Sequence, residues 1–194
     1  MKRLSVTLFI FCTFCAHAQK TLLPAHLSHG VYCAPHIAAA SFGPDHQSGL
    51  FAGGRIGWII EHRYTVGIQA SQLWTNIKAD WTPSEEQLYL NFSYAGIRLS
   101  YCYRSEDVVH IELFALYGGG VAGYRRQEFG DYDNVQDELQ VFEPGMAVEL
   151  NMTHFMRLGA SLSYLVVHGI ELPDMSDQDF SGPRFALFFM VGIF

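Results

Sequence analysis

The sequence predicts an all-β fold, an eight-stranded antiparallel up-and-down transmembrane β-barrel preceded by a cleavable signal peptide. Two observations lead to this prediction. The 194 residues contain eight strand-length segments, and the connections between these segments are alternately short and long. The chain also begins with an export signal and ends in an apolar run from Pro183 to Phe194. Small outer-membrane barrels combine strands of about 9 to 11 residues with short periplasmic turns and long external loops.

The strands are recognised by the alternation of apolar and polar side chains, which is clear in the second, fifth and seventh segments. In the seventh, Met156, Leu158 and Leu162 share one face, whereas Arg157 and Ser161 share the other. The first face can meet lipid and the second can line a lumen. Glycines on the inner face are expected to make room for large side chains from the opposite wall. The expected strands are 29–40, 48–60, 64–74, 87–104, 108–124, 139–150, 155–168 and 183–194.

The connections predict the orientation of the barrel. Short turns of outer-membrane barrels lie in the periplasm and long loops lie outside. Because the number of strands is even, both termini are expected in the periplasm. The tight turns are expected at 61–63, 105–107 and 151–154, and the long polar loops at 41–47, 75–86, 125–138 and 169–182.

The first residues have the three parts of a secretory signal. Lys2 and Arg3 precede an apolar stretch, and Ala16-His17-Ala18 supplies small residues at the positions that a signal peptidase recognises. Lipidation is not favoured, because Cys12 and Cys15 each follow a phenylalanine. We therefore expect a signal peptide over 1–18, a short periplasmic segment over 19–28 and a barrel domain over 29–194.

Composition excludes several classes of function. Removal of Lys2 and Arg3 with the signal changes the formal net charge from −7 to −9, and no basic run remains, so nucleic acid is not an expected partner. After the signal, no apolar stretch reaches the ~18 residues of a membrane helix. Cys33 and Cys102 fall on non-adjacent strands, so no disulfide is expected, and their spacing does not suit zinc.

Two strands depart from regular alternation. In the fourth, the apolar positions change parity between Phe92 and Ile97, which predicts a β-bulge near Tyr94 and Ala95. In the sixth, Pro144 cannot donate a hydrogen bond to a neighbouring strand, which predicts a second bulge at 143–145. The eighth segment is apolar on both faces, so its register cannot be assigned from the pattern.

Charged residues at inward positions form candidate pairs. Counting back from the turns places Arg98 opposite Glu112 and Glu149 opposite Arg157, all inside the barrel. An eight-stranded barrel is only just wide enough for side chains, and an unpaired buried charge is costly. Ion pairs that fill the lumen are therefore favoured over an ion path or gate. The full set of candidate lumen charges is Arg98, Glu112, Glu149, Arg157, Arg55 and Glu143.

Acidic residues gather in the two longest loops, where they are candidates for binding divalent cations or a basic partner. The spacing of Asp131, Asp133 and Asn134 lacks the glycine and the final glutamate of a calcium-binding loop. A solvated acidic surface is therefore the favoured interpretation. His26, His29 and His36 are the only histidine cluster, and no metal site is expected there. The candidate cation-binding residues are Asp131, Asp133, Asp137, Asp174, Asp177 and Asp179.

The last third of the chain resembles a known group of proteins. The stretches FEPGMAVELN at 142–151, LGASLSY at 158–164 and GIELP at 169–173, followed by Ser176-Asp177, are similar to small outer-membrane β-barrel proteins of the Bacteroidota. The resemblance implies the same fold and location. It supplies no activity and no catalytic residue.

The expected function is a structural or surface-interaction role in the outer membrane, without a large pore, an enzymatic activity or a cofactor. The expected partners are outer-membrane lipid, lipopolysaccharide and the barrel assembly machinery, for which Phe194 would be a terminal recognition signal. A small ion or solute channel is the first alternative. A lipid A-modifying enzyme is the second, and it would need a serine, a histidine and a carboxylate near the outer leaflet, such as Ser163, His168 and Glu171.

Overall fold

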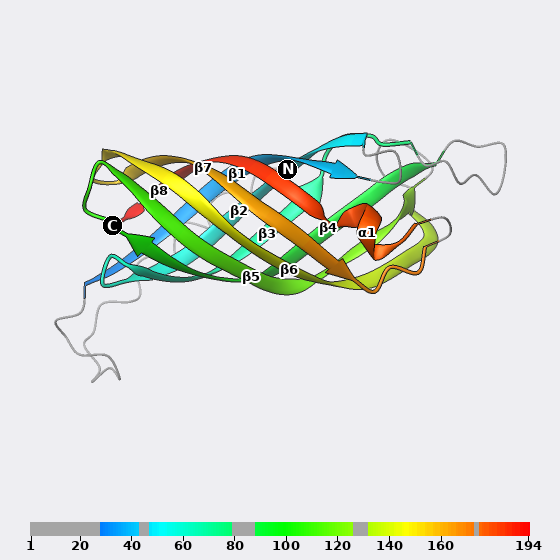
Figure 1. The fold of residues 1–194 in the computed structure, drawn as a ribbon, viewed down its shortest axis with the longest axis horizontal. Helices are drawn as coiled ribbons and strands as arrows, with labels where there is room; N and C mark the ends of the chain where they lie inside the picture. The colour runs from blue at the N-terminus through cyan, green and yellow to red at the C-terminus, as the bar shows by residue number, and fades with distance from the viewer. Residues whose placement is uncertain (1–27, 43–46, 79–87, 126–131, 173–174) are drawn as a thin grey trace, which may run out of the picture.

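The structure, a computed structural model, describes residues 28–42, 47–78, 88–125, 132–172 and 175–194. These residues form one closed barrel of eight antiparallel strands, in which each strand pairs with its neighbours in the sequence and β8 pairs with β1 (Figure 1). The predicted fold class is confirmed. The predicted signal peptide at 1–18 and nearly all of the segment 19–28 lie outside the described residues.

Each strand overlaps its predicted segment, and the bounds mostly agree within two residues. The described parts of the connections contain one short helix, α1 (Asp177–Phe180), which the sequence did not predict. The chain's C-terminus and the short turns lie at one end of the barrel, and α1 lies at the other (Figure 1). We call these the short-turn end and the loop end. The strands are β1 (His29–Phe42), β2 (Gln47–Ile60), β3 (Tyr64–Leu73), β4 (Tyr89–Tyr103), β5 (Val109–Arg125), β6 (Tyr132–Thr153), β7 (Met156–His168) and β8 (Gly182–Ile193).

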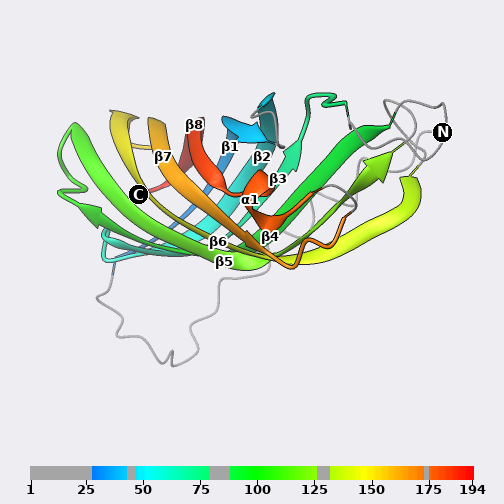
Figure 2. The same ribbon diagram turned by 45° about the vertical axis from the view of Figure 1, so that its right-hand side comes forward.

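Strand β6 is much longer than predicted. It has 22 residues and begins at Tyr132, within the segment that was expected to be a polar loop. Its first residue pairs with Arg125 at the end of β5, which also pairs with Tyr89 at the start of β4, so these three strands reach the loop end together (Figure 2). Outward side chains in such an extension have no need to be apolar, so alternation of apolar residues could not reveal it.

The predicted bulge in β4 is wrong. Its register with β3 and with β5 is unbroken, and Leu90, Phe92 and Tyr94 all face inward together with Arg98. The interior is apolar at the loop end and charged further down, so apolar residues in β4 mark the inner face in one half and the outer face in the other. This change of interior, rather than a bulge, produces the change of parity.

The predicted bulge at Pro144 is also wrong. Pro144 faces Ala115 on β5 in an unbroken register, and the register with β7 is the same on both sides of the proline. Between Gln140 and Asn151, the pairings of Glu143 and Pro144 are the ones missing with β7, which is the local cost of the absent N–H group. The register shifts of β6 occur elsewhere, opposite Gly123–Arg125 and at Asn151–Thr153.

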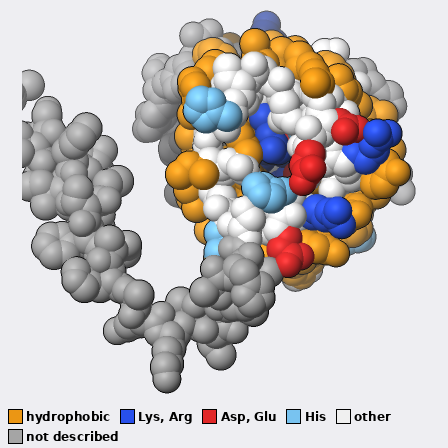
Figure 3. Space-filling view, turned by 90° about the vertical axis from the view of Figure 1, so that its left-hand side faces the viewer, with side chains coloured by type: hydrophobic (Ala, Val, Ile, Leu, Met, Phe, Trp, Pro, Cys, Tyr) orange, Lys and Arg blue, Asp and Glu red, His pale blue; other side chains and the backbone are white. Residues whose placement is uncertain are grey.

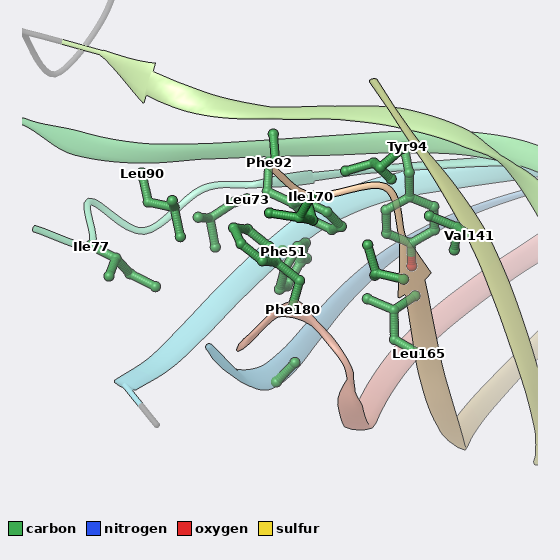
Figure 4. Packing of buried hydrophobic residues seen from close by; sticks show 14 of the residues in the cluster. Phe51, Leu73, Ile77, Leu90, Phe92, Tyr94, Val141, Leu165, Ile170 and Phe180 are labelled. Carbon is green, nitrogen blue, oxygen red and sulfur yellow. The ribbon is translucent and has the colours of Figure 1, made fainter. Parts of the chain in front are cut away.

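Two apolar clusters fill the interior. The larger, which we call the loop-end cluster, gathers buried residues of β1 to β8 around Phe180 of α1 (Figure 4). The ring centroid of Phe180 lies 5.3 Å from that of Phe92, so α1 contributes an aromatic side chain to the packing of the loop-end cluster. The smaller cluster lies towards the short-turn end and comprises Tyr32, Ala34, Ile59, Phe114, Ala147, Phe188 and Met190.

The inward glycines serve neighbouring strands rather than the opposite wall. Tyr32 is paired with Gly57 across β1 and β2, and Phe188 is paired with Gly159 across β8 and β7. A Cβ atom on Gly159 would lie 2.2 Å from Cζ of Phe188. The absence of a side chain therefore lets each inward ring lie down over the adjacent strand, which is how glycine and aromatic residues stabilise each other in strongly curved sheets.

Both described cysteines are free. Cys33 lies exposed on β1 and Cys102 lies buried on β4, the strands predicted for them. Within the described residues, no helix is long and apolar enough to cross a membrane.

Candidate functional site

The charged side chains of the interior form two hydrogen-bonded networks, one above the other along the barrel. All six predicted lumen charges are buried and belong to these networks. The network nearer the short turns, which we call the short-turn network, contains Arg55, Arg98, His110, Glu112, Glu149 and Arg157. The second, which we call the loop-side network, is centred on Glu143 and Arg184.

In the short-turn network, Arg55 joins two carboxylates. Its Nη1 lies 3.4 Å from Oε2 of Glu112, and its Nη2 lies 3.3 Å from Oε1 of Glu149. Glu112 also accepts a hydrogen bond of 2.9 Å from Nη2 of Arg98, whose Nη1 donates to Oε1 of Gln69 at 3.2 Å. One arginine thus connects β2 to β5 and β6 across the lumen.

Glu149 is surrounded by three cationic or titratable groups. Its Oε2 lies 3.0 Å from Nε2 of His110 and 3.4 Å from Nη1 of Arg157, and its Oε1 faces Arg55. His110 faces inward, and its side chain is fully buried. Each carboxylate of this network therefore has at least two cationic or imidazole partners.

The two predicted ion pairs form, although the registers that predicted them are wrong. Arg98 lies opposite Leu116 rather than Glu112, and Glu149 lies opposite Gly159 rather than Arg157. Both errors arise from placing the turns too early, and both are an even number of residues, which preserves the inward face. Long arginine side chains then reach the carboxylates diagonally.

The loop-side network includes residues that sequence reasoning missed. Oε1 of Glu143 accepts hydrogen bonds from Nη1 of Arg184 at 2.8 Å and from Oγ of Ser163 at 2.7 Å, and Oε2 accepts one from the hydroxyl of Tyr94 at 2.7 Å. Nη2 of Arg184 donates to Oγ of Ser71 at 2.9 Å. His36 lies beside them, with Nε2 2.8 Å from the same oxygen.

Arg184 was missed because β8 looked apolar on both faces. Its inward residues are Arg184, Ala186, Phe188 and Met190. The signal was available, since one arginine within an otherwise apolar strand of a barrel has to face the interior.

Aromatic rings lie against three of the arginines. The guanidinium carbon of Arg98 lies 3.4 Å from the ring centroid of Phe114, and that of Arg55 lies 4.0 Å from the centroid of Phe188. Phe194 covers Arg157 in the same way at 3.8 Å. These contacts favour the charged guanidinium while excluding water from it. The side chain of Phe194 thus belongs to the interior near the short-turn end.

The space left between the two networks is small. A cavity of about 10 Å³ lies among Arg55, Arg98, Glu143 and Arg184, which is close to the minimum for one water molecule. In this part of the barrel, the arrangement joins the strands to one another through paired charges.

The candidate cation-binding residues are only partly described, and those that are have other roles. Oδ2 of Asp137 accepts a hydrogen bond from the N–H of Glu171 at 2.7 Å, and Oδ1 of Asp177 accepts one from the N–H of Ile170 at 2.8 Å. Oδ2 of Asp179 accepts a hydrogen bond from the N–H of Ser176 at 2.8 Å. Among the described residues, no three acidic, histidine or cysteine side chains are gathered in a manner suited to a metal ion. Asp131, Asp174 and the side chain of Asp133 lie outside the described part.

Of the residues considered for catalysis or metal binding, those that the structure describes do not come together, and His26 lies outside the described residues. Ser163 faces inward to Glu143, whereas His168 is exposed on the outer face beside Asp177. His29 is exposed and packs against Trp58, whereas His36 is buried in the loop-side network. Residues separated by an odd number of positions on one strand point to opposite faces, which separates both pairs.

A scan against protein-family models finds no match to the chain, and a search of curated proteins finds none either. Among solved structures, the chain is similar to the N-terminal β-barrel domain of Pseudomonas aeruginosa OprF, with a TM-score of 0.56 and 11% sequence identity over 84% of this chain and 97% of that domain. It is also similar to Neisserial surface protein A, NspA, with a TM-score of 0.55 and 15% identity over 86% of this chain and 97% of that one. Both are small eight-stranded outer-membrane barrels, and the likeness concerns the fold.

Proposed function

We propose that the protein is an integral β-barrel of the outer membrane with a structural or surface-interaction role and no large pore. One observation carries the proposal. The strands carry exposed apolar side chains on the outside and keep their charged pairs inside, which reverses the arrangement of a water-soluble protein. The charged residues Arg55, Arg98, Glu112, Glu143, Glu149, Arg157 and Arg184 are all buried.

The aromatic residues of the outer face support membrane insertion. Tyr64 and Tyr101 pack against each other on β3 and β4 near the short-turn end, with ring centroids 5.4 Å apart, and Trp58 and Tyr103 are exposed at the same end. Aromatic girdles of this kind lie at the membrane–water interfaces of outer-membrane barrels. The exposed aliphatic residues of the same strands, among them Ile56, Ile68, Ile97 and Leu99, would lie in the hydrocarbon layer.

The packed interior supports a role other than bulk transport. The loop-end cluster, the loop-side network and the short-turn network follow one another along the lumen and involve residues of all eight strands. A channel for ions would have to pass all three layers. The enzymatic alternative has little support, because Ser163 and His168 face opposite sides of β7.

The proposed orientation places the short turns and both termini in the periplasm and the long loops outside. The proposed partners are outer-membrane lipid and lipopolysaccharide along the wall, the barrel assembly machinery during insertion, and an extracellular partner or divalent cations at the acidic loops. The resemblance to small barrels of the Bacteroidota would be consistent with this assignment.

Cell fractionation tests the location. The mature chain is expected in the outer membrane, with the heat-modifiable gel migration of a folded barrel, and deletion of Phe194 is expected to reduce assembly more than a substitution in a loop. Recovery as a soluble periplasmic protein would contradict the proposal.

Reconstitution tests the absence of a pore. Liposomes containing the protein are expected not to swell in small sugars, and planar bilayers are expected to show negligible current. A large gated current in the unmodified protein would instead favour the channel, and passage of sugars would require a larger pore shared between chains.

A further inference from the structure

The barrel has a hollow at its short-turn end. A cavity of about 480 Å³ opens there, lined by residues of the turns and strand ends and by the last residue of the chain. Viewed from this end, basic, acidic and histidine side chains gather in the hollow inside a ring of hydrophobic ones (Figure 3). The lining residues are His62, Ser105, Glu106, Asn151, Thr153, His154, Arg157 and Phe194.

Arg157 is the one lining residue that also belongs to a buried network. Its side chain is 8% exposed, and only Nη1 takes part in its contacts with Glu149 and His110. Nε is buried and has no hydrogen-bond partner among the described residues. A buried donor of a charged group without a partner is costly. The Nε atoms of Arg55, Arg98 and Arg184 are buried without a partner in the same way, so Arg157 differs from them by its place in the cavity wall.

The charge balance of the interior favours an additional anion. The two networks contain four arginines, Arg55, Arg98, Arg157 and Arg184, and three glutamates, Glu112, Glu143 and Glu149. One positive charge is therefore left without a carboxylate of its own. Arg157 is nearest to solvent of the arginines, since it lines the open cavity, and an anion from solution can reach it there.

We propose that the short-turn cavity binds a small oxyanion, a carboxylate or a phosphate group, on Arg157. Its guanidinium carries parallel N–H groups, which match the spacing of two oxygens of such an anion, and Nη2 takes no part in the contacts with Glu149 and His110. Phe194 stacks on the face of the guanidinium and holds its plane, leaving the edge as the side at which an acceptor can bind.

The cavity walls offer further donors and one opposing charge. His62 and His154 come from two different turns, and Thr153 supplies a hydroxyl, whereas the carboxylate of Glu106 disfavours an anion on its own side. Asn151 is already committed, because its Nδ2 donates to the carbonyl oxygens of Asp107 at 2.7 Å and Ser105 at 3.2 Å. The available donors are therefore Arg157, at the inner end of the cavity, and the side chains of His62, Thr153 and His154 at the turns.

The site is a closed end rather than an entrance to a channel. Above Arg157, Glu149 and Arg55 occupy the lumen, and the loop-end cluster seals it further on. An anion bound at Arg157 would thus be held on the side of the membrane that the short turns face, and the site would bind a ligand rather than conduct it.

Isothermal titration calorimetry on the complete, detergent-solubilised barrel tests the proposal. Inorganic phosphate and acetate are titrated separately in a constant chloride background, because spherical chloride cannot use the paired donors. At least one of the two is expected to bind saturably. Arg157→Lys keeps the charge beside Glu149 but lacks the fork, and it is expected to weaken binding by about tenfold.

Arg104→Lys is the matched control, since Arg104 is an exposed arginine on a short turn, where it pairs with Asp107. This control should bind as the parent does. Equal weakening in both variants, or the absence of saturable binding in the parent, would overturn the proposal.

A second variant covers the case in which Arg157→Lys does not fold. Replacing His62 and His154 together by alanine leaves the buried networks intact and is expected to weaken binding a few-fold by removing wall donors. Unchanged affinity in this variant would count against the site.

Discussion

Glu143 and Arg184 illustrate how single residues hold this barrel together. Both side chains are almost completely buried, and Glu143 accepts hydrogen bonds from three side chains of three strands, β4, β7 and β8. A buried pair of this kind adds little net stability compared with apolar packing, but removing one partner leaves a charge without compensation. The networks therefore specify which strands meet and at what height.

Glu143→Gln is expected to destabilise the barrel by about 3 kcal/mol, because the substitution keeps the shape but leaves Arg184 without a carboxylate. Urea unfolding in lipid vesicles measures the change. Arg104→Gln, which breaks the exposed pair with Asp107, should cost less than ~1 kcal/mol. Equal losses of stability in the two variants would show that the buried pair contributes no more to the fold than the exposed pair does.

Gly159→Ala tests the pairing of inward glycines with aromatic rings. The added Cβ would lie 2.2 Å from the ring of Phe188, so the ring must move away from Arg55, and a loss of about 1 to 3 kcal/mol is expected. Gly182→Ala is the control, because no atom of the described residues lies within 4 Å of its Cβ position. Combining Gly159→Ala with Phe188→Leu should recover part of the loss, and purely additive effects would argue against the contact.

At the scale of the elements, the sequence predicted the positions of the strands well and their details less well. Alternation along β7 gave the correct inward and outward faces, because its inward residues are polar or glycine as far as Ser163 and become apolar only at Leu165 and Val167. It failed in β4, where the interior changes from charged at Arg98 to apolar at Phe92. The registers were misjudged because they depend on where the turns close, at Arg104–Val108 for β4 and β5, and one sequence does not reveal this.

The helix α1 was also not predictable from periodicity, since its four residues are too few to show any. Its role depends on Phe180, which is buried against Phe92 in the loop-end cluster. The capping box between Ser176 and Asp179, in which the carboxylate accepts hydrogen bonds from both the N–H and the hydroxyl of Ser176, fixes its start. The contact of Phe180 with the lumen depends on the closed barrel, so the local sequence around α1 does not predict it.

Phe180→Ala is expected to destabilise the fold by about 3 to 5 kcal/mol through the cavity that it leaves at the loop end. Gln178→Ala, on the exposed side of the same helix, should change little. Unfolding in vesicles measures both. An effect of Phe180→Ala below ~1 kcal/mol would mean that α1 does not contribute to the packing of the loop-end cluster.

At the scale of the whole molecule, the barrel is ordered in layers. An apolar cluster occupies the loop end, two charged networks with interleaved rings occupy the middle, and an open cavity containing Arg157 occupies the short-turn end. The predicted sets of charges were found, because charge in a barrel strand belongs inside. The order of the layers was not predicted, because it depends on the register of all eight strands, including β8 with Arg184.

The central claim is that the outer wall lies in a bilayer, and a single charge introduced at mid-wall tests it most directly. Leu162 lies at the middle of β7 and is 57% exposed. In a bilayer, Leu162→Arg should cost about 2 to 4 kcal/mol, whereas Met152→Arg, at the short-turn end of β6, should cost only about 0 to 1 kcal/mol. Urea-dependent folding into lipid vesicles gives both values. Losses below ~0.5 kcal/mol at both positions, as expected for a surface that faces water, would contradict the account.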